Sequence, residues 1–262
     1  MFWRKKRKRK KVGLALGGGS VRGAAHLGVL EVLEQEGIRP DYVAGVSAGS
    51  VVGAVYCAGL DLDEMKRLAS DLQWRKLGRV TRPRLGFFDG KPLEGYLEEV
   101  IGPHQFEDLE IPFAAVAVDI VRGELVVLSE GPVAPAVRAS CAIPGIFTPV
   151  ERGEQMLVDG GVLNNLPVSV AREMGADYVI AVDLLPPTIW GARPRNLFEM
   201  FHLSFYTLLR AAHSEAPVAD CLIVPAIGRF TLWDFSQVDA LIEKGREAAE
   251  TKIEQIKQDL EL

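Results

Sequence analysis

The chain has 262 residues, of which 48% are hydrophobic and 25% charged, so it can bury one full core. Its net charge of −5 is unevenly distributed, because residues 4–11 (RKKRKRKK) are all basic and the remainder is strongly acidic. An acidic body repels phosphate backbones, so we expect no nucleic-acid partner. The cysteines Cys57, Cys141 and Cys221 are odd in number and widely spaced, which favours a reducing compartment over a disulfide framework and gives no metal-binding spacing.

The start of the chain lacks the pattern of a secretory signal. Only the short apolar run 12–16 separates the basic residues from Gly17-Gly18-Gly19, too little for the apolar core of a signal peptide. No stretch approaches the roughly 20 apolar residues of a membrane span. We therefore predict an unprocessed cytoplasmic protein, soluble or held peripherally at the inner face of the membrane.

The first elements predict a parallel sheet. Residues 12–16 have the pattern of a buried strand, followed by a glycine loop and a helix over about 22–35. A second strand over 41–46 and a second helix over 47–58 repeat this order. Alternating strands and helices are typical of α/β folds.

The rest of the chain continues the alternation. Residues 75–90 are basic and contain Pro and Gly, which predicts a surface loop or lid. We expect helices over 61–73, 91–101, 132–142, 167–174, 197–213 and 237–260, strands over 113–119, 124–128, 147–150, 155–158, 178–183 and 222–226, and a linker over 186–196. The predicted organisation is a basic, disordered arm over 1–11 and a single domain over 12–262.

The sequence Gly45-Val46-Ser47-Ala48-Gly49 matches the G-x-S-x-G pattern of a nucleophile elbow. In that motif a sharp strand-to-helix turn exposes the serine hydroxyl, and small neighbours such as Gly45 and Gly49 relieve crowding. The free N–H groups at the start of the following helix favour an oxyanion nearby. The pattern indicates that Ser47 is a nucleophile, although a tight turn that needs small residues is the alternative interpretation.

A serine nucleophile needs a base, and histidines are few in this chain. His26 lies on the first predicted helix, where a packed or hydrogen-bonded role is favoured. His104 is the second of the four histidines. His202 and His213 come late enough to allow the Ser…Asp…His order of α/β-hydrolases.

Aspartates end three of the predicted apolar strands: Asp119, Asp159 and Asp183. Ligands gather at the carboxyl ends of strands in open α/β sheets, so each is a candidate site residue. Asp159 differs because Gly160-Gly161 follows and lets the backbone turn tightly beside the carboxylate. An ordinary Asp-Gly turn is the alternative.

The first glycine loop is LGGGSVRG, residues 16–23. Its spacing fits neither the dinucleotide fingerprint G-x-G-x-x-G nor a phosphate-binding loop with Gly-Lys-Ser/Thr. What remains is a row of backbone N–H groups at a helix start, suited to an anion or a developing oxyanion.

Together these segments resemble the patatin-like phospholipase family, specifically its short bacterial members. The likeness runs from about Val12 to Ala226 and rests on four blocks in order: LALGGGSVRGAAHLGVL, GVSAGS, RASCAIPGIFTPV and LVDGGVLNNLPVSVAREMGADYVIAVDL. The resemblance implies a three-layer α/β/α fold with a mostly parallel central sheet. It also implies a serine lipid acyl hydrolase with a Ser47-Asp159 dyad and an acyl-enzyme, without a metal, a cofactor or a role for histidine.

The resemblance further assigns the oxyanion hole to Gly17, Gly18 and Gly19, with Arg22 fixing the loop. Many members carry four glycines before a small residue and the Arg-Gly, whereas Ser20 and Val21 stand before Arg22 here. The expected substrates are lipid or other carboxylic esters.

Other features have less specific interpretations. Ser140 and Cys141 are expected to pack, and Asn164-Asn165 to cap or turn into the next helix. Residues 2–11 combine bulky apolar and cationic side chains and either contact an anionic membrane or form a solubilising arm. The apolar segment 196–209 is expected to pack on the core or on a second copy of the chain, in a homo-oligomer, rather than on lipid. The rival functions are an esterase with a late histidine and a membrane-associated regulatory module with little turnover.

Overall fold

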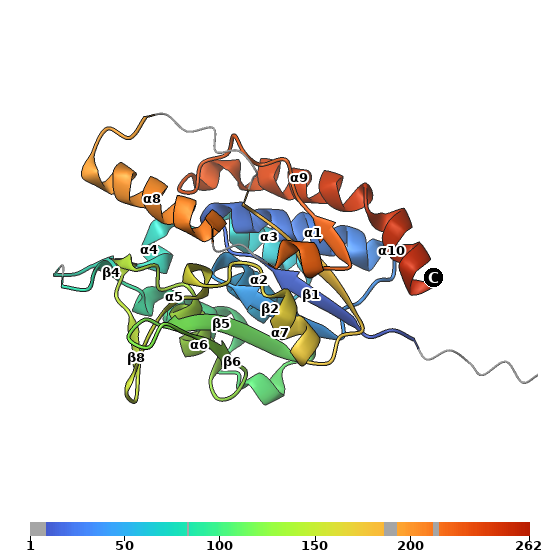
Figure 1. Cartoon of the computed structure of the whole chain (residues 1–262), viewed down its shortest axis with the longest axis horizontal. Helices are drawn as coiled ribbons and strands as arrows, with labels where there is room; N and C mark the ends of the chain where they lie inside the picture. Colours follow the sequence, from blue (N-terminus) through green and yellow to red (C-terminus); the bar gives the residue numbers. More distant parts are fainter. Residues whose placement is uncertain (1–8, 83, 186–192, 212–214) are drawn as a thin grey trace, which may run out of the picture.

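A mostly parallel β-sheet runs through the middle of the protein (Figure 1). The computed structural model describes residues 9–82, 84–185, 193–211 and 215–262. The strands follow the order β11-β10-β1-β2-β5-β9-β8, parallel as far as β5 and antiparallel from there, and β6 also pairs with β5. Their bounds are β1 Val12–Leu16, β2 Tyr42–Val46, β5 Phe113–Asp119, β6 Glu124–Leu128, β8 Val150–Arg152, β9 Gln155–Asp159, β10 Tyr178–Val182 and β11 Cys221–Ile223.

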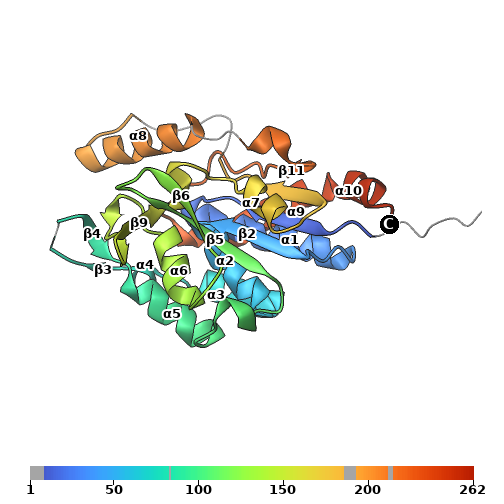
Figure 2. The same cartoon turned by 60° about the horizontal axis from the view of Figure 1, so that its bottom comes forward.

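Helices cover both faces of this sheet (Figure 2). Side chains alternate along a strand, so Leu14 and Leu16 of β1 point to one face and Ala15 to the other. The leucines pack in the cluster that includes α1 (Ala25–Gln35), α2 (Ala48–Cys57) and α9 (Val238–Glu250), and Ala15 packs in the cluster of α7 (Val168–Glu173). The predicted three-layer α/β/α arrangement is confirmed.

The remaining helices are close to the expected ranges, with two differences. The helix predicted from residue 22 begins as a 3₁₀ turn, Ser20–Ala24, before α1. The closing helix is divided into α9 and α10 near Thr251, whose hydroxyl donates to the carbonyl of Ala248. The other helices are α3 Leu62–Ser70, α5 Lys91–Ile101, α6 Val133–Ser140, α8 Leu197–Ala211 and α10 Ile253–Leu260. The predicted linker 186–196 and the end of the helix predicted over 197–213 lie partly outside the described residues.

A second, three-stranded sheet corrects the prediction for residues 75–90. This segment contains α4 (Trp74–Leu77), β3 (Arg79–Val80) and β4 (Gly86–Asp89), and β4 pairs in parallel with β7 (Gly145–Phe147). The close approach of β4 to β7 depends on Gly86, since a Cβ there would lie 2.5 Å from the Phe147 carbonyl carbon. Strands this short have too few residues to show an alternating pattern, which explains the wrong prediction of a loop and the displaced strand at 147–150.

Helices α1 and α9 cross with their backbones almost in contact. A Cβ on Gly28 would lie 1.9 Å from the carbonyl oxygen of Ile242, and a Cβ on Gly245 would lie 1.9 Å from that of Ala25. The crossing thus depends on glycine in both helices. Helix α9 in this way covers the helix that follows the glycine loop.

The described ends of the chain are neighbours. Arg9 forms an ion pair with Asp41, and Lys10 Nζ donates to the Asp259 carbonyl of α10 at 2.8 Å. Both ends lie at the opposite end of the molecule from β4 (Figure 1). Within the described ranges, no helix combines the length and apolarity needed to cross a bilayer.

Candidate active site

Ser47 occupies a sharp turn between β2 and α2. Its φ of 52° is in the left-handed region, which is uncommon for a residue other than glycine. The elbow glycines make this turn possible by close packing: a Cβ on Gly45 would lie 2.5 Å from the Gly49 carbonyl oxygen, and one on Gly49 would lie 2.2 Å from that of Leu16. The strand, turn and helix that the motif requires are therefore present, with Ser47 at the start of the helix.

Two serines support this turn. Ser140 Oγ accepts a hydrogen bond from the Ser47 amide at 2.9 Å and donates to the Val116 carbonyl at 2.6 Å, and Ser50 Oγ donates to the Ser47 carbonyl at 2.6 Å. Ser140 is fully buried, as the expected packing role requires, but its link to the elbow was not foreseen. Burial raises the pKa of the neighbouring Cys141 thiol, which keeps that thiol protonated and unreactive.

Asp159 is the strand-end aspartate that lies beside Ser47. It ends β9 and is only 3% exposed, and its Oδ1 accepts a hydrogen bond from the Gly161 amide at 2.8 Å. Burial disfavours the carboxylate and raises the pKa of Asp159 to about 6, while the Ser47 hydroxyl and the Gly161 amide act in the opposite direction. Gly160 is needed for this turn, because a Cβ there would lie 2.3 Å from the Val116 carbonyl oxygen.

The other two strand-end aspartates form turns of their own. Asp119 Oδ1 accepts from the Val121 amide at 3.1 Å, and its carboxylate lies 3.7 Å from Arg122 Nε. Asp183 Oδ1 accepts from the Leu185 amide at 2.8 Å. These contacts give both residues a role at the ends of their strands, apart from Ser47.

The three loop glycines are not equivalent as hydrogen-bond donors. The Gly17 amide donates to the Val182 carbonyl at 3.0 Å, and the Gly18 amide donates to the Asn165 carbonyl at 3.2 Å. The Gly19 amide has no acceptor among the described residues. Gly18 nevertheless packs on Ser47, since a Cβ on Gly18 would lie 3.1 Å from Ser47 Cβ. Of the three loop amides, only that of Gly19 is thus without an acceptor among the described residues, and the oxyanion hole stays a prediction.

Asn165 joins the glycine loop to the turn after Asp159, a role the sequence did not reveal. Its Nδ2 donates to the Gly18 carbonyl at 3.1 Å, and its Oδ1 would lie 2.8 Å from a Cβ on Gly161. Its side chain is 2% exposed. Of the two expected roles for Asn164-Asn165, Asn164 has the turn, since its Oδ1 accepts from the Leu166 amide, whereas Pro167 is the N-cap residue of α7.

His26 and Arg22 hold the glycine loop from behind. His26 Nε2 donates to the Gly17 carbonyl at 2.8 Å, and complete burial lowers the pKa of His26 to about 4, so the ring is neutral. The buried Arg22 guanidinium donates to the Phe230 carbonyl and, at 2.7 Å, to the Tyr206 hydroxyl of α8. The expected hydrogen-bonded role of His26 is confirmed. Arg22 connects the loop to α8 and the 230 region.

The structure does not describe the side chains of the two late histidines, His202 and His213. His202 lies on α8, but its side chain falls outside the described set, and His213 lies outside the described residues. On the same helix, Tyr206 is buried, whereas Met200 and Leu208 are exposed. The expected packing of this segment on the core therefore holds for one part of its surface.

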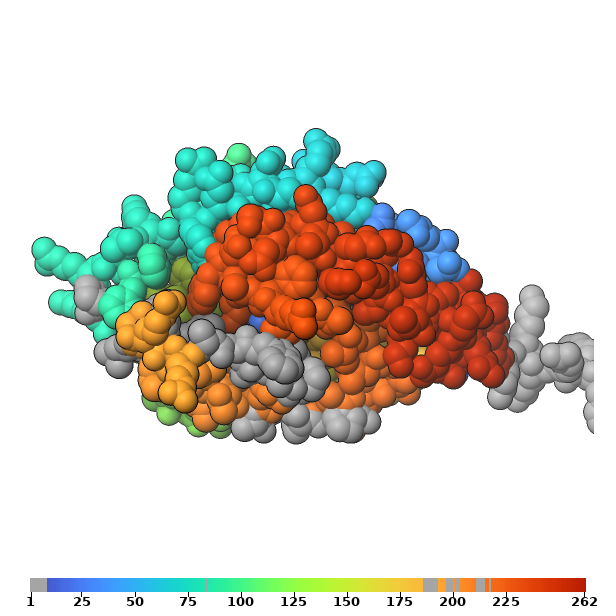
Figure 3. Space-filling view, turned by 90° about the horizontal axis from the view of Figure 1, so that it is seen from above, coloured from blue at the N-terminus to red at the C-terminus, as the bar shows by residue number. Residues whose placement is uncertain are grey.

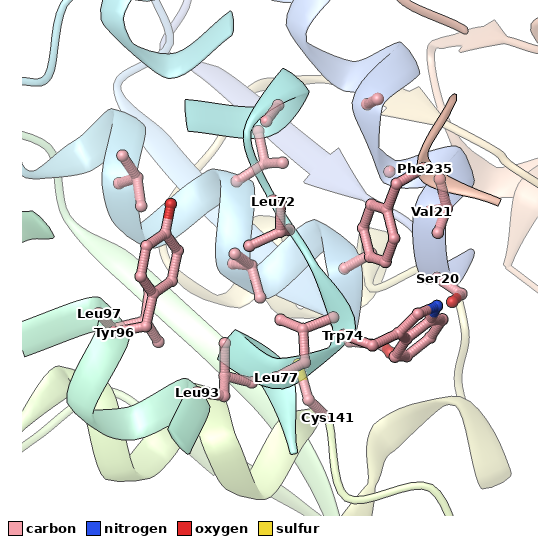
Figure 4. Close-up of a pocket in the computed structure, with 18 of the residues that line it drawn as sticks. Ser20, Val21, Leu72, Trp74, Leu77, Leu93, Tyr96, Leu97, Cys141 and Phe235 are labelled. Atoms are coloured by element: carbon pink, nitrogen blue, oxygen red, sulfur yellow. The ribbon is translucent and has the colours of Figure 1, made fainter. Parts of the chain in front are cut away.

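Two apolar pockets meet at Ser47. The larger, about 170 Å³, extends from Ser47 along α2 and is surrounded by side chains of α4 and α5 such as Trp74, Leu77 and Leu93 (Figure 4). The smaller, about 40 Å³, lies between the glycine loop, Asp159 and α8. Most of the lining surface of both is apolar. No three His, Cys, Asp or Glu side chains gather as metal ligands in the part of the chain that the structure describes.

A family model of patatin-like phospholipases matches residues 14–172, which include Ser47 and Asp159. The chain belongs to this family. Over 177 residues this patatin-like chain is 40% identical to an uncharacterized NTE family protein of Mycobacterium bovis, covering 66% of this chain and 49% of that protein. An uncharacterized NTE family protein of Mycobacterium tuberculosis is 31% identical over 275 residues, covering 94% of this chain and 47% of that protein.

A mouse relative carries the family name in its own description. The patatin-like phospholipase domain-containing protein 6 of Mus musculus is 36% identical over 183 residues, which cover 66% of this chain and 13% of that protein. The chain spans about half the length of the mycobacterial relatives that it matches.

The fold is shared with solved structures of low sequence identity. VipD from Legionella pneumophila is 15% identical with a TM-score of 0.56, covering 95% of this chain and 67% of that chain. The type III effector protein ExoU of Pseudomonas aeruginosa is 14% identical with a TM-score of 0.53, covering 95% and 53%. The patatin-like α/β fold expected from the sequence is thus confirmed.

Proposed function

We propose that the chain is a serine lipid acyl hydrolase that cleaves carboxylic esters through Ser47 and Asp159. The observation that carries the proposal is the arrangement around the elbow: Ser47 lies beside a buried aspartate whose pKa is about 6, at the meeting point of two apolar pockets. Membership of the patatin-like phospholipase family supports the reaction class.

The proposed reaction needs only these two side chains and a water molecule. Ser47 Oγ attacks the ester carbonyl carbon and its proton passes to Asp159. The tetrahedral intermediate collapses, the C–O bond to the alcohol breaks, and Asp159 returns the proton to the leaving alkoxide. Water then attacks the acyl-enzyme and gives a proton to Asp159, which passes it to Ser47 Oγ as the acid leaves.

The environment of Asp159 makes it a stronger base than an aspartate in water. Its raised pKa brings the proton affinity of the carboxylate closer to what general-base catalysis needs near neutral pH. The Gly19 amide, which has no acceptor among the described residues, and the start of α2 would stabilise the oxyanion.

The pockets favour an ester with a substantial apolar acyl group. The larger pocket follows α2 away from Ser47 past Val51 and Val55, so it suits an acyl chain. The smaller pocket, next to Asp159 and Gly19, suits the alcohol, which receives its proton from Asp159.

The test is labelling with a fluorophosphonate followed by mass mapping of the modified residue. We expect the label on Ser47, and its loss in Ser47→Ala. We expect Asp159→Asn to reduce labelling and hydrolysis of p-nitrophenyl esters at least 100-fold, because it removes the base. Thermal unfolding of each variant checks that the fold is retained.

The rival functions give different results in the same experiment. Loss of turnover in His202→Ala or His213→Ala, with Asp159→Asn still active, would favour the esterase with a late histidine. A folded protein that takes no label while a control serine hydrolase does would contradict catalysis and favour the regulatory module.

A further inference from the structure

The hairpin of β3 and β4 lies at one end of the molecule (Figure 3) and exposes apolar side chains there. Val80 is 76% exposed, the highest value among the large apolar side chains that the structure describes. Leu85 and Phe87, on the other arm of the hairpin, are 56% and 53% exposed. Apolar side chains exposed together in this way usually mark an interaction surface.

The same segment concentrates positive charge on an acidic protein. Residues 74–91 contain a single acid, Asp89, whereas the whole chain has a net charge of −5. Asp89 forms an ion pair with Arg79 at 3.2 Å. The basic residues of the segment are Arg75, Lys76, Arg79, Arg82, Arg84 and Lys91.

The cations of the hairpin strands and turn are Arg79, Arg82 and Arg84, of which Arg79 pairs with Asp89. Arg82 and Arg84 are exposed, and no carboxylate among the described residues pairs with either. Lys76 lies over the Tyr96 ring, in a region that also contains Asp71 and Glu99. The hairpin therefore presents two exposed arginines that no described carboxylate neutralises.

We propose that the β3–β4 hairpin is a docking surface for a lipid bilayer that contains anionic lipids. Aliphatic and aromatic side chains between arginines suit such an interface, because the apolar groups enter the acyl boundary while the guanidinium groups contact phosphates. The hairpin projects from the body at one end of the molecule (Figures 1 and 3), where a flat layer can reach it. The aliphatic Val80 and Leu85 have no flat face on which nucleic-acid bases would stack.

The hairpin is joined to the wall of the larger pocket. Strand β4 pairs with β7, and the Thr148 amide donates to the Phe88 carbonyl at 2.8 Å. Phe147 and Thr148 line the pocket, as do Trp74 and Leu77 just before the hairpin. A bilayer bound to the β3–β4 hairpin would therefore lie next to the pocket that contains Ser47.

This surface is distinct from the membrane contact predicted for residues 2–11. The described end of that arm, residues 9–11, lies by α10 at the opposite end of the molecule (Figure 1). The two predictions therefore place different ends of the protein on the bilayer and can be separated by mutation.

The test measures co-sedimentation of the protein with vesicles of phosphatidylcholine alone or mixed with phosphatidylglycerol. The Ser47→Ala protein is used, so that binding is measured without hydrolysis and does not depend on the proposed reaction. We expect binding to the anionic vesicles that weakens as salt is added. We expect a loss of at least tenfold in Leu85→Ser/Phe87→Ser and in Arg82→Glu/Arg84→Glu.

Matched variants make the outcome specific. Val121→Ser/Arg152→Glu changes an exposed apolar and an exposed basic residue elsewhere and should bind like the parent, as should a protein without residues 2–8. Hydrolysis of a short soluble ester by the hairpin variants with Ser47 restored should stay within about twofold, which reports an intact fold. Absent vesicle binding, binding lost only with residues 2–8, or a dimer formed through the hairpin in its place would each overturn the proposal.

Discussion

At the scale of single residues, the site combines a strained serine with a buried acid. Ser47 holds a φ of 52°, and Asp159 is 3% exposed. Each arrangement costs folding free energy and persists because neighbouring hydrogen bonds enforce it. The raised pKa of Asp159 leads to two measurable expectations.

The first expectation is a pH profile. Asp159 accepts the Ser47 proton only when ionised, so kcat/KM for a soluble ester should fall about tenfold per pH unit below a pKa of about 6. Steady-state kinetics between about pH 4.5 and 8 measure this, with fluorescence over the same range as a control for folding. A rate that stays constant down to about pH 4.5 would contradict the assignment of Asp159 as base.

The second expectation concerns stability. The pKa of Asp159 rises from 3.8 to about 6 on folding, so the folded state binds this proton more tightly and ionisation destabilises it. The cost is absent below about pH 4, grows between about pH 4 and 6, and reaches about 3 kcal/mol above that. Asp159→Asn should therefore raise the free energy of unfolding at pH 8 but not at pH 4.

Urea unfolding at both pH values tests this. Ser47→Ala serves as the matched inactive variant, because it keeps the buried carboxylate and should show no gain. Protonation of the buried His26 destabilises the fold between about pH 6.5 and 4, but it affects all three proteins alike. A gain in Asp159→Asn that is equal at pH 8 and pH 4 would show that the carboxylate carries no such cost.

Sequence patterns indicated the two proposed catalytic residues but not the residues that support them in the fold. The elbow around Ser47 and the Asp-Gly-Gly turn are local patterns, so the sequence could indicate them. Ser140 contacts the elbow across 93 residues and Asn165 contacts Gly18 across 147, and no local spacing reports such contacts. The loss of Gly17 and Gly18 as free donors also depends on partners in distant strands and turns.

At the scale of elements, the crossing of α1 and α9 depends on glycine, which has no side chain, at Gly28 and Gly245. Alanine usually stabilises a helix by about 1 kcal/mol relative to glycine. At Gly245 we expect the opposite, a loss of about 1–3 kcal/mol, because the added Cβ would lie 1.9 Å from the Ala25 carbonyl oxygen and separate the helices.

Gly95 provides the matched control on α5. A Cβ there would meet no atom within 4 Å, so Gly95→Ala should stabilise the protein by about 0.5–1 kcal/mol. Denaturant unfolding of the two variants compares them directly. Equal effects would mean that the α1–α9 contact adjusts without cost.

The prediction of elements succeeded where the sequence pattern was long enough. Strands such as β1, β5 and β10 are buried apolar runs of five to seven residues, and their positions follow from the sequence. Strand β3 has two residues and β7 three, and pairing with β4 rather than propensity makes them strands. Tertiary contacts therefore determine the strands of residues 75–90, for which the sequence predicts a loop.

At the scale of the whole molecule, opposite ends have different characters. The hairpin and α4 lie at one end, and both described chain ends lie at the other (Figure 1). The total charge of −5 hides this polarity, because the cations of residues 74–91 are concentrated in space. The sequence predicted an acidic body with a basic arm, and the structure adds the exposed apolar and cationic hairpin at the other end.

The contact between Lys10 and the Asp259 carbonyl has a practical meaning for protein engineering. Because the two ends are neighbours, a short linker from Leu262 to residue 9 would close the backbone into a ring without crossing the pocket. The turn at Gly123, which is exposed and free of close neighbours, offers a place to reopen it. Circular permutation at this turn would divide the β5–β6 hairpin but would not cut the elbow, the glycine loop or the turn at Asp159.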